Sequence, residues 1–373
     1  MRPRPTRAEI DLGALVSNYR LLAERARPGQ MLPIVKADAY GHGAVRCARA
    51  LEAAGASWLG VATIEEGLEL REAGSSARIV LLNGLFDGQA DACVERDLTP
   101  VVYRLATLVD LDAAARRLGK RARAHLKIDT GMGRVGVPWQ ELGSWLGDLK
   151  QFTQVEIEGV LTHLADADLA DQAFSRGQVA RFDAAVRAMT EAGLRPRFVH
   201  FANSAATATA LAGEANLARP GILLYGARPS PGFETDLPLR PVMRFVTETI
   251  FVKRVPAGTP ISYGRTFVTP RESVIATLPV GYADGLPRLL GNRGEVLVRG
   301  KRLPIIGRVC MDLTMIDATD YVPDLASGEE AVLFGEQAGA RIDVEEVAGW
   351  ADTIGYEVLC GISRRVPRVH LGP

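Results

Sequence analysis

The feature that most constrains the fold is a regular alternation of short apolar runs with helical patterns between about residues 30 and 220. Several of the runs are apolar on both faces, as the strands of a parallel sheet require. Eight runs are strand candidates, at residues 31–36, 58–62, 78–82, 99–103, 122–128, 157–162, 197–200 and 216–219. The helical patterns between them include residues 45–54, 64–73, 105–118 and 174–192.

Eight strands joined by helices predict an α/β fold, a (β/α)8 barrel of the TIM type. An open, doubly wound sheet is the alternative, because the sequence does not show whether a sheet closes. A further helical pattern at residues 15–25 precedes the first strand and is expected to cover one end of the barrel.

The pattern changes after about residue 235, which is consistent with a second domain in a chain of 373 residues. Strand-like runs separated by Gly and Pro turns predict a mainly-β domain; they lie at residues 242–252, 273–279, 294–298 and 303–306. The only helical pattern in this region is at 344–351, and residues 229–238 resemble a linker. We therefore predict a barrel domain at 1–234 and a β-rich domain at 235–373.

Composition excludes several classes of partner. Lys and Arg together number 44, the same as Asp and Glu, so we expect no nucleic-acid partner that binds through phosphate neutralisation. No apolar run reaches the roughly 18–20 residues of a membrane span, and no apolar secretory segment begins the chain. The four cysteines and five histidines are spread along the sequence, so we predict free thiols, no metal site and a cytoplasmic location.

Polar residues end several of the predicted strands. Lys36 ends the first, Lys127 lies on the fifth, His163 follows the sixth, His200 ends the seventh and Arg219 ends the eighth. In a barrel of this type the chemistry gathers at the carboxyl ends of the strands, so these side chains are candidates for one site. A desolvated lysine shifts its pKa readily and is suited to forming a Schiff base. A lysine that only snorkels from a strand end is the alternative for Lys36.

Two loops add candidate binding groups. Glycines at 131 and 133 precede Arg134, whose guanidinium is suited to a carboxylate, although a turn with a surface arginine has the same pattern. Gly221 and Ile222 follow Arg219 and can present backbone N–H groups to a phosphate. A structural ion pair is the alternative for Arg219.

Together these segments resemble the alanine racemase family almost from end to end. The resemblance is carried by residues 35–43 (VKADAYGHG), 125–134 (HLKIDTGMGR) and 219–221 (RPG). Residues 262–264 (SYG), 281–285 (GYADG) and 310–312 (CMD) also match. The family has a barrel that carries pyridoxal 5'-phosphate, followed by a β domain, and it works as a homodimer with shared active sites.

The resemblance implies a role for each matching residue. Lys36 would carry the cofactor as an aldimine and act as one catalytic base, and Tyr263 of the partner subunit would be the second. Further cofactor contacts would come from Tyr40, Arg134, His163, Ser204, Arg219, Gly221, Ile222 and Tyr356. Substrate contacts would come from Arg134, Tyr282, Met311 and Asp312, and Lys127 matches a lysine that is often carboxylated.

The implied activity is the interconversion of L-alanine and D-alanine by two-base proton transfer, which supplies D-alanine for peptidoglycan. A decarboxylase of the same architecture is the nearest alternative, but such enzymes usually place a carboxylate where Arg219 stands. A non-catalytic, single-barrel cofactor-binding protein would lack residues 235–373. A barrel hydrolase with two metals would need clustered histidines.

Overall fold

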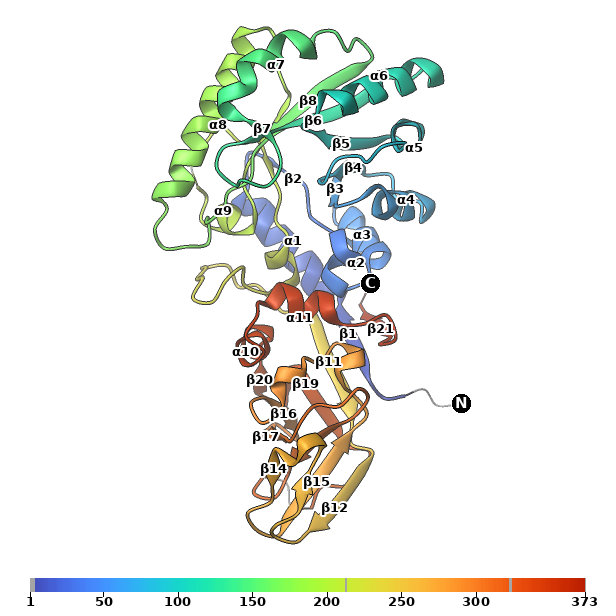
Figure 1. The fold of residues 1–373 in the computed structure, drawn as a ribbon, viewed down its shortest axis with the longest axis vertical. Coiled ribbons are helices and arrows are strands. Elements are labelled where there is room, and N and C mark those ends of the chain that lie inside the picture. Colours follow the sequence, from blue (N-terminus) through green and yellow to red (C-terminus); the bar gives the residue numbers. More distant parts are fainter. Residues whose placement is uncertain (1–3, 212, 322–323, 373) are drawn as a thin grey trace.

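The barrel, in the upper part of Figure 1, is formed by eight parallel strands. The computed structural model describes residues 4–211, 213–321 and 324–372. The barrel strands are β2 (Gln30–Met31), β3 (Trp58–Val61), β4 (Arg78–Leu81), β5 (Leu98–Val102), β6 (Ala122–Asp129), β8 (Val155–Leu161), β9 (Phe198–His200) and β10 (Leu217–Ala218). A short strand, β7 (Val137–Pro138), pairs with the end of β6.

Backbone hydrogen bonds close the barrel. The strands from β3 to β9 form one sheet, and β10 pairs in parallel with β2. On one side of that pair, Ile34 bridges to Gly60 on β3. On the other side, the Asn216 N–H donates to the Val199 carbonyl of β9, at 2.9 Å. The predicted closed barrel is therefore confirmed, and the open sheet is excluded.

Helices cover the outside of the barrel. Four of them match the predicted helical patterns, namely α3 (Ala44–Ala53), α4 (Ile64–Glu72), α6 (Leu105–Leu118) and α8 (Ala173–Glu191). The sequence did not predict α5 (Ala90–Glu95), α7 (Leu142–Leu149) or the short α9 (Ser204–Ala208). Their ends follow local rules. A capping box formed by Thr63 and Glu66 begins α4, and Gly119 ends α6 in the left-handed conformation, with φ of 59°.

The lower part of Figure 1 is a second, mostly antiparallel sheet, ordered β12-β15-β18-β17-β16-β19-β11-β1-β21, with β20 on β19. Its strands are β1 (Arg7–Asp11), β11 (Met243–Glu248), β12 (Phe251–Val255), β15 (Ser273–Leu278), β16 (Glu295–Val298), β17 (Lys301–Ile306), β18 (Thr314–Asp317), β19 (Glu330–Gln337), β20 (Ala340–Ile342) and β21 (Arg368–Leu371). A separate hairpin joins β13 (Pro260–Ile261) to β14 (Phe267–Val268). Helices α10 (Val344–Trp350) and α11 (Gly355–Gly361) lie between the two parts (Figure 1).

The first strand of the chain belongs to the second sheet. Strand β1 lies between β11 and β21, and it leads directly into α1 (Leu12–Arg25), which packs against α3 and α9 of the barrel. Asp11 joins the two elements by accepting a hydrogen bond from the Ala14 N–H at 2.8 Å. The division between residues 234 and 235 stays a prediction, and the β-rich sheet also takes in a strand from the amino terminus.

The β-rich character of the second region is confirmed, although the sequence patterns missed several of its elements. Strands β18 to β21 and helix α11 were not predicted. Strands β18, β20 and β21 are short and have no long apolar run. Strand β19 has eight residues with a buried apolar run at 331–334, and this run was overlooked in the sequence. Among the described residues, no helix is both long enough and apolar enough to cross a membrane.

Asn18, which is fully buried on α1, fixes this helix to the segment that joins the two parts. Its amide donates to the carbonyls of Leu224 and Arg240 at 3.0 and 2.7 Å, and its oxygen accepts from the Arg240 N–H at 2.9 Å.

We expect Asn18→Ala to lower the free energy of unfolding by about 3 kcal/mol, because it leaves three backbone groups without their partner. Urea unfolding monitored by tryptophan fluorescence measures the loss. Gln151→Ala is the control, since its amide donates only to Asp148 at the surface; it should change the stability by less than about 0.5 kcal/mol. Equal effects of the two substitutions would contradict this assignment.

Candidate active site

A cavity of about 470 Å³ lies at the carboxyl ends of the barrel strands. Residues from six barrel strands or the loops after them line it, together with Tyr356 from α11. The lining includes nearly all the barrel residues and the tyrosine that the sequence predicted for the site: Lys36, Tyr40, Lys127, Arg134, His163, Ser204, Arg219, Gly221, Ile222 and Tyr356. The strand-end candidate His200 does not line the cavity and instead lies behind Arg219, with its Nδ1 3.0 Å from NH1. Barrel closure thus brings together residues that are far apart in the sequence.

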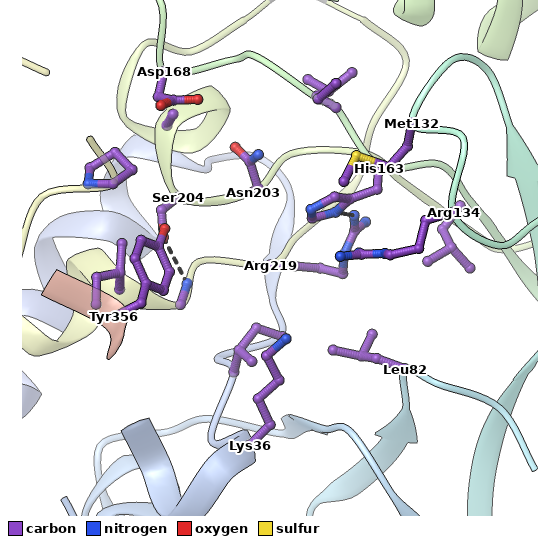
Figure 2. A pocket seen from close by; sticks show the side chains of 18 of the residues that line it. Lys36, Leu82, Met132, Arg134, His163, Asp168, Asn203, Ser204, Arg219 and Tyr356 are labelled. Carbon is purple, nitrogen blue, oxygen red and sulfur yellow. Dashed lines mark hydrogen bonds between the residues drawn. The ribbon is translucent and has the colours of Figure 1, made fainter. Parts of the chain in front are cut away.

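The cavity is strongly cationic. Its lining carries two lysines and two arginines, namely Lys36, Lys127, Arg134 and Arg219, against the single carboxylate of Asp168. Figure 2 shows Lys36 reaching into the cavity, with Arg134 and His163 on one side and Ser204 and Tyr356 on the other. Such an excess of positive charge in a concave site favours an anionic ligand.

Lys36 begins a left-handed turn. Residues 37–40 all have φ between 52° and 54° and ψ between 41° and 52°. This conformation costs roughly 1–2 kcal/mol for each residue that has a Cβ atom. Strained backbone conformations of this kind persist only where contacts with the surrounding structure hold them, and such positions often lie at functional sites.

Two side chains hold the turn in place. The Glu66 carboxylate accepts the N–H groups of Ala37 at 2.7 Å and Ala62 at 2.6 Å, and that of Thr63 at 3.3 Å. His42 Nδ1 lies 2.9 Å from the carbonyls of both Ala39 and Tyr40. Because carbonyls only accept, Nδ1 carries the proton, and burial lowers the pKa of His42 to about 4, so the ring is neutral.

Burial lowers the pKa of Lys36, and the nearby Arg134 guanidinium lowers it further. A larger share of the amine is therefore neutral than in an exposed lysine, and only the neutral amine can attack a carbonyl carbon.

Lys127 is 5% exposed, and burial together with Arg134 and Arg219 lowers its pKa to about 8. No carboxylate lies within ion-pair distance of Lys127 in the described part of the chain. Burying a positively charged amine among other cations costs free energy unless the amine loses its positive charge.

Arg219 is buried and held from several directions. Its NH1 donates to His200 Nδ1 at 3.0 Å. Its NH2 donates to the Thr162 carbonyl at 2.8 Å and lies 3.4 Å from His163 Nδ1. Burial lowers the pKa of Arg219 to about 9, which still leaves the guanidinium protonated at neutral pH.

The five histidines are spread along the sequence, but the barrel brings three of them together. His125, His163 and His200 form one group with Arg219.

The opposite end of the cavity is built from small groups and hydroxyls. The Ser204 hydroxyl accepts the N–H groups of Gly221 at 2.8 Å and Leu223 at 3.4 Å, where the 3-10 helix η2 (Ile222–Tyr225) begins. A Cβ atom at Gly221 would lie 2.3 Å from the Tyr40 hydroxyl oxygen, so only glycine fits there. The rings of Tyr40 and Tyr356 are 6.0 Å apart.

The remaining predicted residues lie outside this cavity, on the second domain. Tyr263, on the 3-10 helix η3 (Tyr263–Arg265), is 71% exposed, and Tyr282 and Met311 are also exposed. The Asp312 carboxylate pairs with Arg365 at 2.6 Å. Within one chain, the structure therefore does not bring these residues to Lys36.

Two family profiles match the chain: "Alanine racemase, N-terminal domain" over residues 10–229 and "Alanine racemase, C-terminal domain" over residues 242–370. The chain belongs to the alanine racemase family. The alanine racemase of Geobacter sulfurreducens is 46% identical over 378 residues, which cover all of this chain and 99% of that protein. The family and the enzyme class predicted from the sequence, an amino-acid racemase, are therefore confirmed.

Solved structures of family members are similar over the whole length. The crystal structure of the Streptomyces lavendulae alanine racemase matches with a TM-score of 0.94 and 41% identity, covering 100% of this chain and 98% of that one. The Bartonella henselae alanine racemase, described with covalently bound pyridoxal phosphate, matches with a TM-score of 0.89 and 33% identity, covering 99% of this chain and 100% of that one.

The sequence reasoning missed several residues that shape the racemase-family site. Glu66 and His42 act on the backbone of the Lys36 turn, and His125 reaches Arg219 only through His200. Asp168 lines the cavity from the loop after β8. His42 and His125 stand in segments that the sequence singled out, but neither was given a role there, and Glu66 and Asp168 stand outside those segments. The contacts of Glu66 and His125 depend on how the strands close.

We expect Glu66→Ala to lower the free energy of unfolding by about 2 kcal/mol, because three backbone N–H groups lose a charged acceptor and the strained turn loses its support. Thermal and urea unfolding provide the measurement. Glu65→Ala is the matched control, since its exposed carboxylate accepts only a 3.3 Å hydrogen bond from Gln89. If Glu66→Ala and Glu65→Ala were equally stable, Glu66 would not support the turn.

Proposed function

We propose that this chain is a pyridoxal-phosphate-dependent alanine racemase that works as a homodimer and interconverts L-alanine and D-alanine. The observation that carries the proposal is the position of Lys36, an amine of lowered pKa that reaches into a cationic cavity lined on the other side by Arg219. We also propose a cytoplasmic location and a role in supplying D-alanine for peptidoglycan. The four cysteines are free, which suits a reducing compartment.

The chemistry of the cavity fits the phosphate of this cofactor. Gly221 leaves room that a Cβ atom would fill, and Ser204 and Tyr40 bring hydroxyl groups to the same place. The backbone N–H groups of Gly221 and Ile222 begin a short helical turn and would complete the phosphate site. Tyr356 would add a further hydroxyl from α11.

When bound to a lysine amine, pyridoxal phosphate supplies a conjugated system that withdraws electrons from the α-carbon of an amino acid. Lys36 would form the covalent link and, once displaced by the substrate amine, would move the α-proton on one face. Arg219 would face the pyridine nitrogen and donate a hydrogen bond to it. Because a guanidinium holds its proton tightly, Arg219 would not transfer that proton to the ring. His163, held by Arg219, lies beside it.

Arg134 and Lys127 would bind the substrate at the part of the cavity that they line. The guanidinium of Arg134 is suited to the substrate carboxylate. Lys127, buried among cations, would be stabilised as a carbamate, whose negative charge would pair with Arg134. In that reaction the neutral amine adds to the carbon of CO2, and the amine proton leaves to solvent.

The second proton transfer requires a group from another copy of the chain. We propose that Tyr263 of the partner subunit supplies it, with Tyr282, Met311 and Asp312 near the substrate entrance. The exposure of Tyr263, 71% in the single chain, and of its neighbours on the second domain supports an interface there. A shared site would explain why these residues lie outside the cavity of their own chain.

We expect the purified protein with pyridoxal phosphate to racemise L-alanine, measured by chiral chromatography of several L-amino acids. Lys36→Ala should remove the absorbance of the covalently bound cofactor and lower the rate by at least about 10³-fold, because the same amine holds the cofactor and moves the proton. Lys150→Ala, at an exposed position, is the control and should keep the wild-type rate. A bound-cofactor band that persists in Lys36→Ala would place the cofactor on another lysine.

The shared site is tested by mixing inactive subunits. Tyr263→Ala should slow proton removal from L-alanine far more than from D-alanine. Heterodimers of Lys36→Ala and Tyr263→Ala subunits should regain part of the activity, since one of their two sites contains both native residues. No recovery in verified heterodimers would refute the shared site and leave the cofactor assignment unaffected.

Carboxylation of Lys127 should rise with pH. With a pKa of about 8, roughly one amine in ten is neutral at pH 7 and most are neutral at pH 9. At constant dissolved CO2, the ¹³C NMR carbamate signal from labelled bicarbonate should therefore increase over this range. Lys127→Met should abolish the signal and Lys150→Met should retain it. A Lys127-dependent signal that falls as pH rises would contradict the assignment.

A further inference from the structure

A line of buried polar side chains runs along the inside of the barrel from Glu158 on β8 to Arg219 at the rim. Glu158 Oε1 lies 3.5 Å from His125 Nε2, and His125 Nδ1 lies 2.8 Å from His200 Nε2. His200 Nδ1 is 3.0 Å from Arg219 NH1. Both histidines are fully buried, and Glu158 is 1% exposed. None of the groups between Glu158 and Arg219 has a role in the chemistry described above.

The order of donors along this line is fixed by its two ends. Arg219 can only donate, so His200 Nδ1 must accept and the proton of His200 must sit on Nε2. That N–H then donates to His125 Nδ1, which places the proton of His125 on Nε2, facing Glu158. Burial lowers the pKa of both histidines, which is consistent with neutral rings that carry one proton each.

The far end is built to keep Glu158 ionised. Arg78 donates two hydrogen bonds to the carboxylate, and Arg197 donates one at 3.3 Å. Arg78 is itself fixed, since its guanidinium carbon lies 3.9 Å from the centre of a Trp58 ring. The proton of His125 on Nε2 therefore faces a negative charge at 3.5 Å, an electrostatic contact that favours this tautomer, although in the described part of the chain Nε2 makes no hydrogen bond.

The backbone makes room for this arrangement. Gly159 follows Glu158, and a Cβ atom there would lie 2.6 Å from the His125 ring. The ring therefore packs directly over the strand and keeps both of its nitrogens in line with Glu158 and His200. A larger residue at position 159 would push His125 out of this line.

We propose that Glu158 is a positioning residue that acts through His125 and His200 to hold the guanidinium of Arg219 in place at the cofactor ring. The proposal rests on the proposed function for its consequence in catalysis. Arg219 at one end and Glu158 at the other favour the same tautomers, so with both present His200 presents a lone pair to Arg219 NH1. Without Glu158, Arg219 alone would hold this order, and a His125 ring with its proton on Nδ1 would face the His200 N–H and weaken the contact of His200 with Arg219.

The first test determines which ring nitrogen of His125 and of His200 carries the proton in the cofactor-free chain. Because the chain has five histidines, ¹⁵N-histidine labelling gives five rings for long-range ¹H–¹⁵N correlation spectra. Single histidine substitutions assign the signals. We expect His125 and His200 to be neutral and protonated on Nε2 at pH 7. A proton on Nδ1 of either ring, or an imidazolium, would overturn the proposal.

The second test compares substitutions at Glu158. In Glu158→Gln the side-chain oxygen can still face the His125 N–H, so the tautomers and, within about threefold, kcat should be kept. In Glu158→Leu the two tautomers of His125 should mix, and kcat should fall by about tenfold with little change in KM for alanine. Glu156→Leu, on the same strand but half-exposed and 3.4 Å from Arg197, is the matched control and should retain both.

The outcomes separate the two proposals. Unchanged tautomers or unchanged kcat in folded Glu158→Leu would overturn the positioning role and leave the racemase assignment intact. Expected tautomers in a protein that racemises no amino acid would instead refute the proposed function. Should Glu158→Leu fail to fold because the arginines lose their partner, the tautomers of the wild type and of Glu158→Gln decide the question.

Discussion

The parallel pairing of β2 with β10 is the interaction on which the site depends. It aligns Gln30 with Leu217 and Met31 with Ala218, and so joins the first barrel strand to the last. Lys36 and Arg219 follow these two strands, and closure sets them at the same rim. Without closure the two residues would lie at opposite edges of an open sheet, and no single cavity would hold both.

Closure also gathers positive charge, which has to be compensated. Four cationic side chains line one cavity, and two of them, Lys127 and Arg219, are almost completely buried. Arg219 is compensated by backbone carbonyls and a neutral histidine. Lys127 has no such partner among the described residues, and its lowered pKa expresses that cost. The cavity is thus suited to an anionic cofactor and an anionic substrate.

The local backbone around Lys36 carries a second cost. The left-handed turn at residues 37–40 is unfavourable by itself, and it is held because Glu66 accepts the Ala37 N–H and His42 donates to backbone carbonyls of the turn. The turn buries Tyr40 beside Gly221 while leaving the Lys36 side chain directed into the cavity. Strain is therefore placed where two residues of one turn, Lys36 and Tyr40, line different parts of the same cavity.

The sequence by itself determined the alternation of strands and helices, the β-rich second part and most of the residues around the cavity. Periodicity and strand-end polar groups are local signals, and the family motifs identify residues one by one. Only the tertiary structure decided that β1 joins the second sheet, that Glu66 supports the Lys36 turn and that His125 reaches Arg219 through His200. These contacts join segments from different strands, so they depend on the order and register of strand pairing. Local sequence patterns do not specify which strands pair or in what register, because strand pairing depends on how the whole sheet is buried.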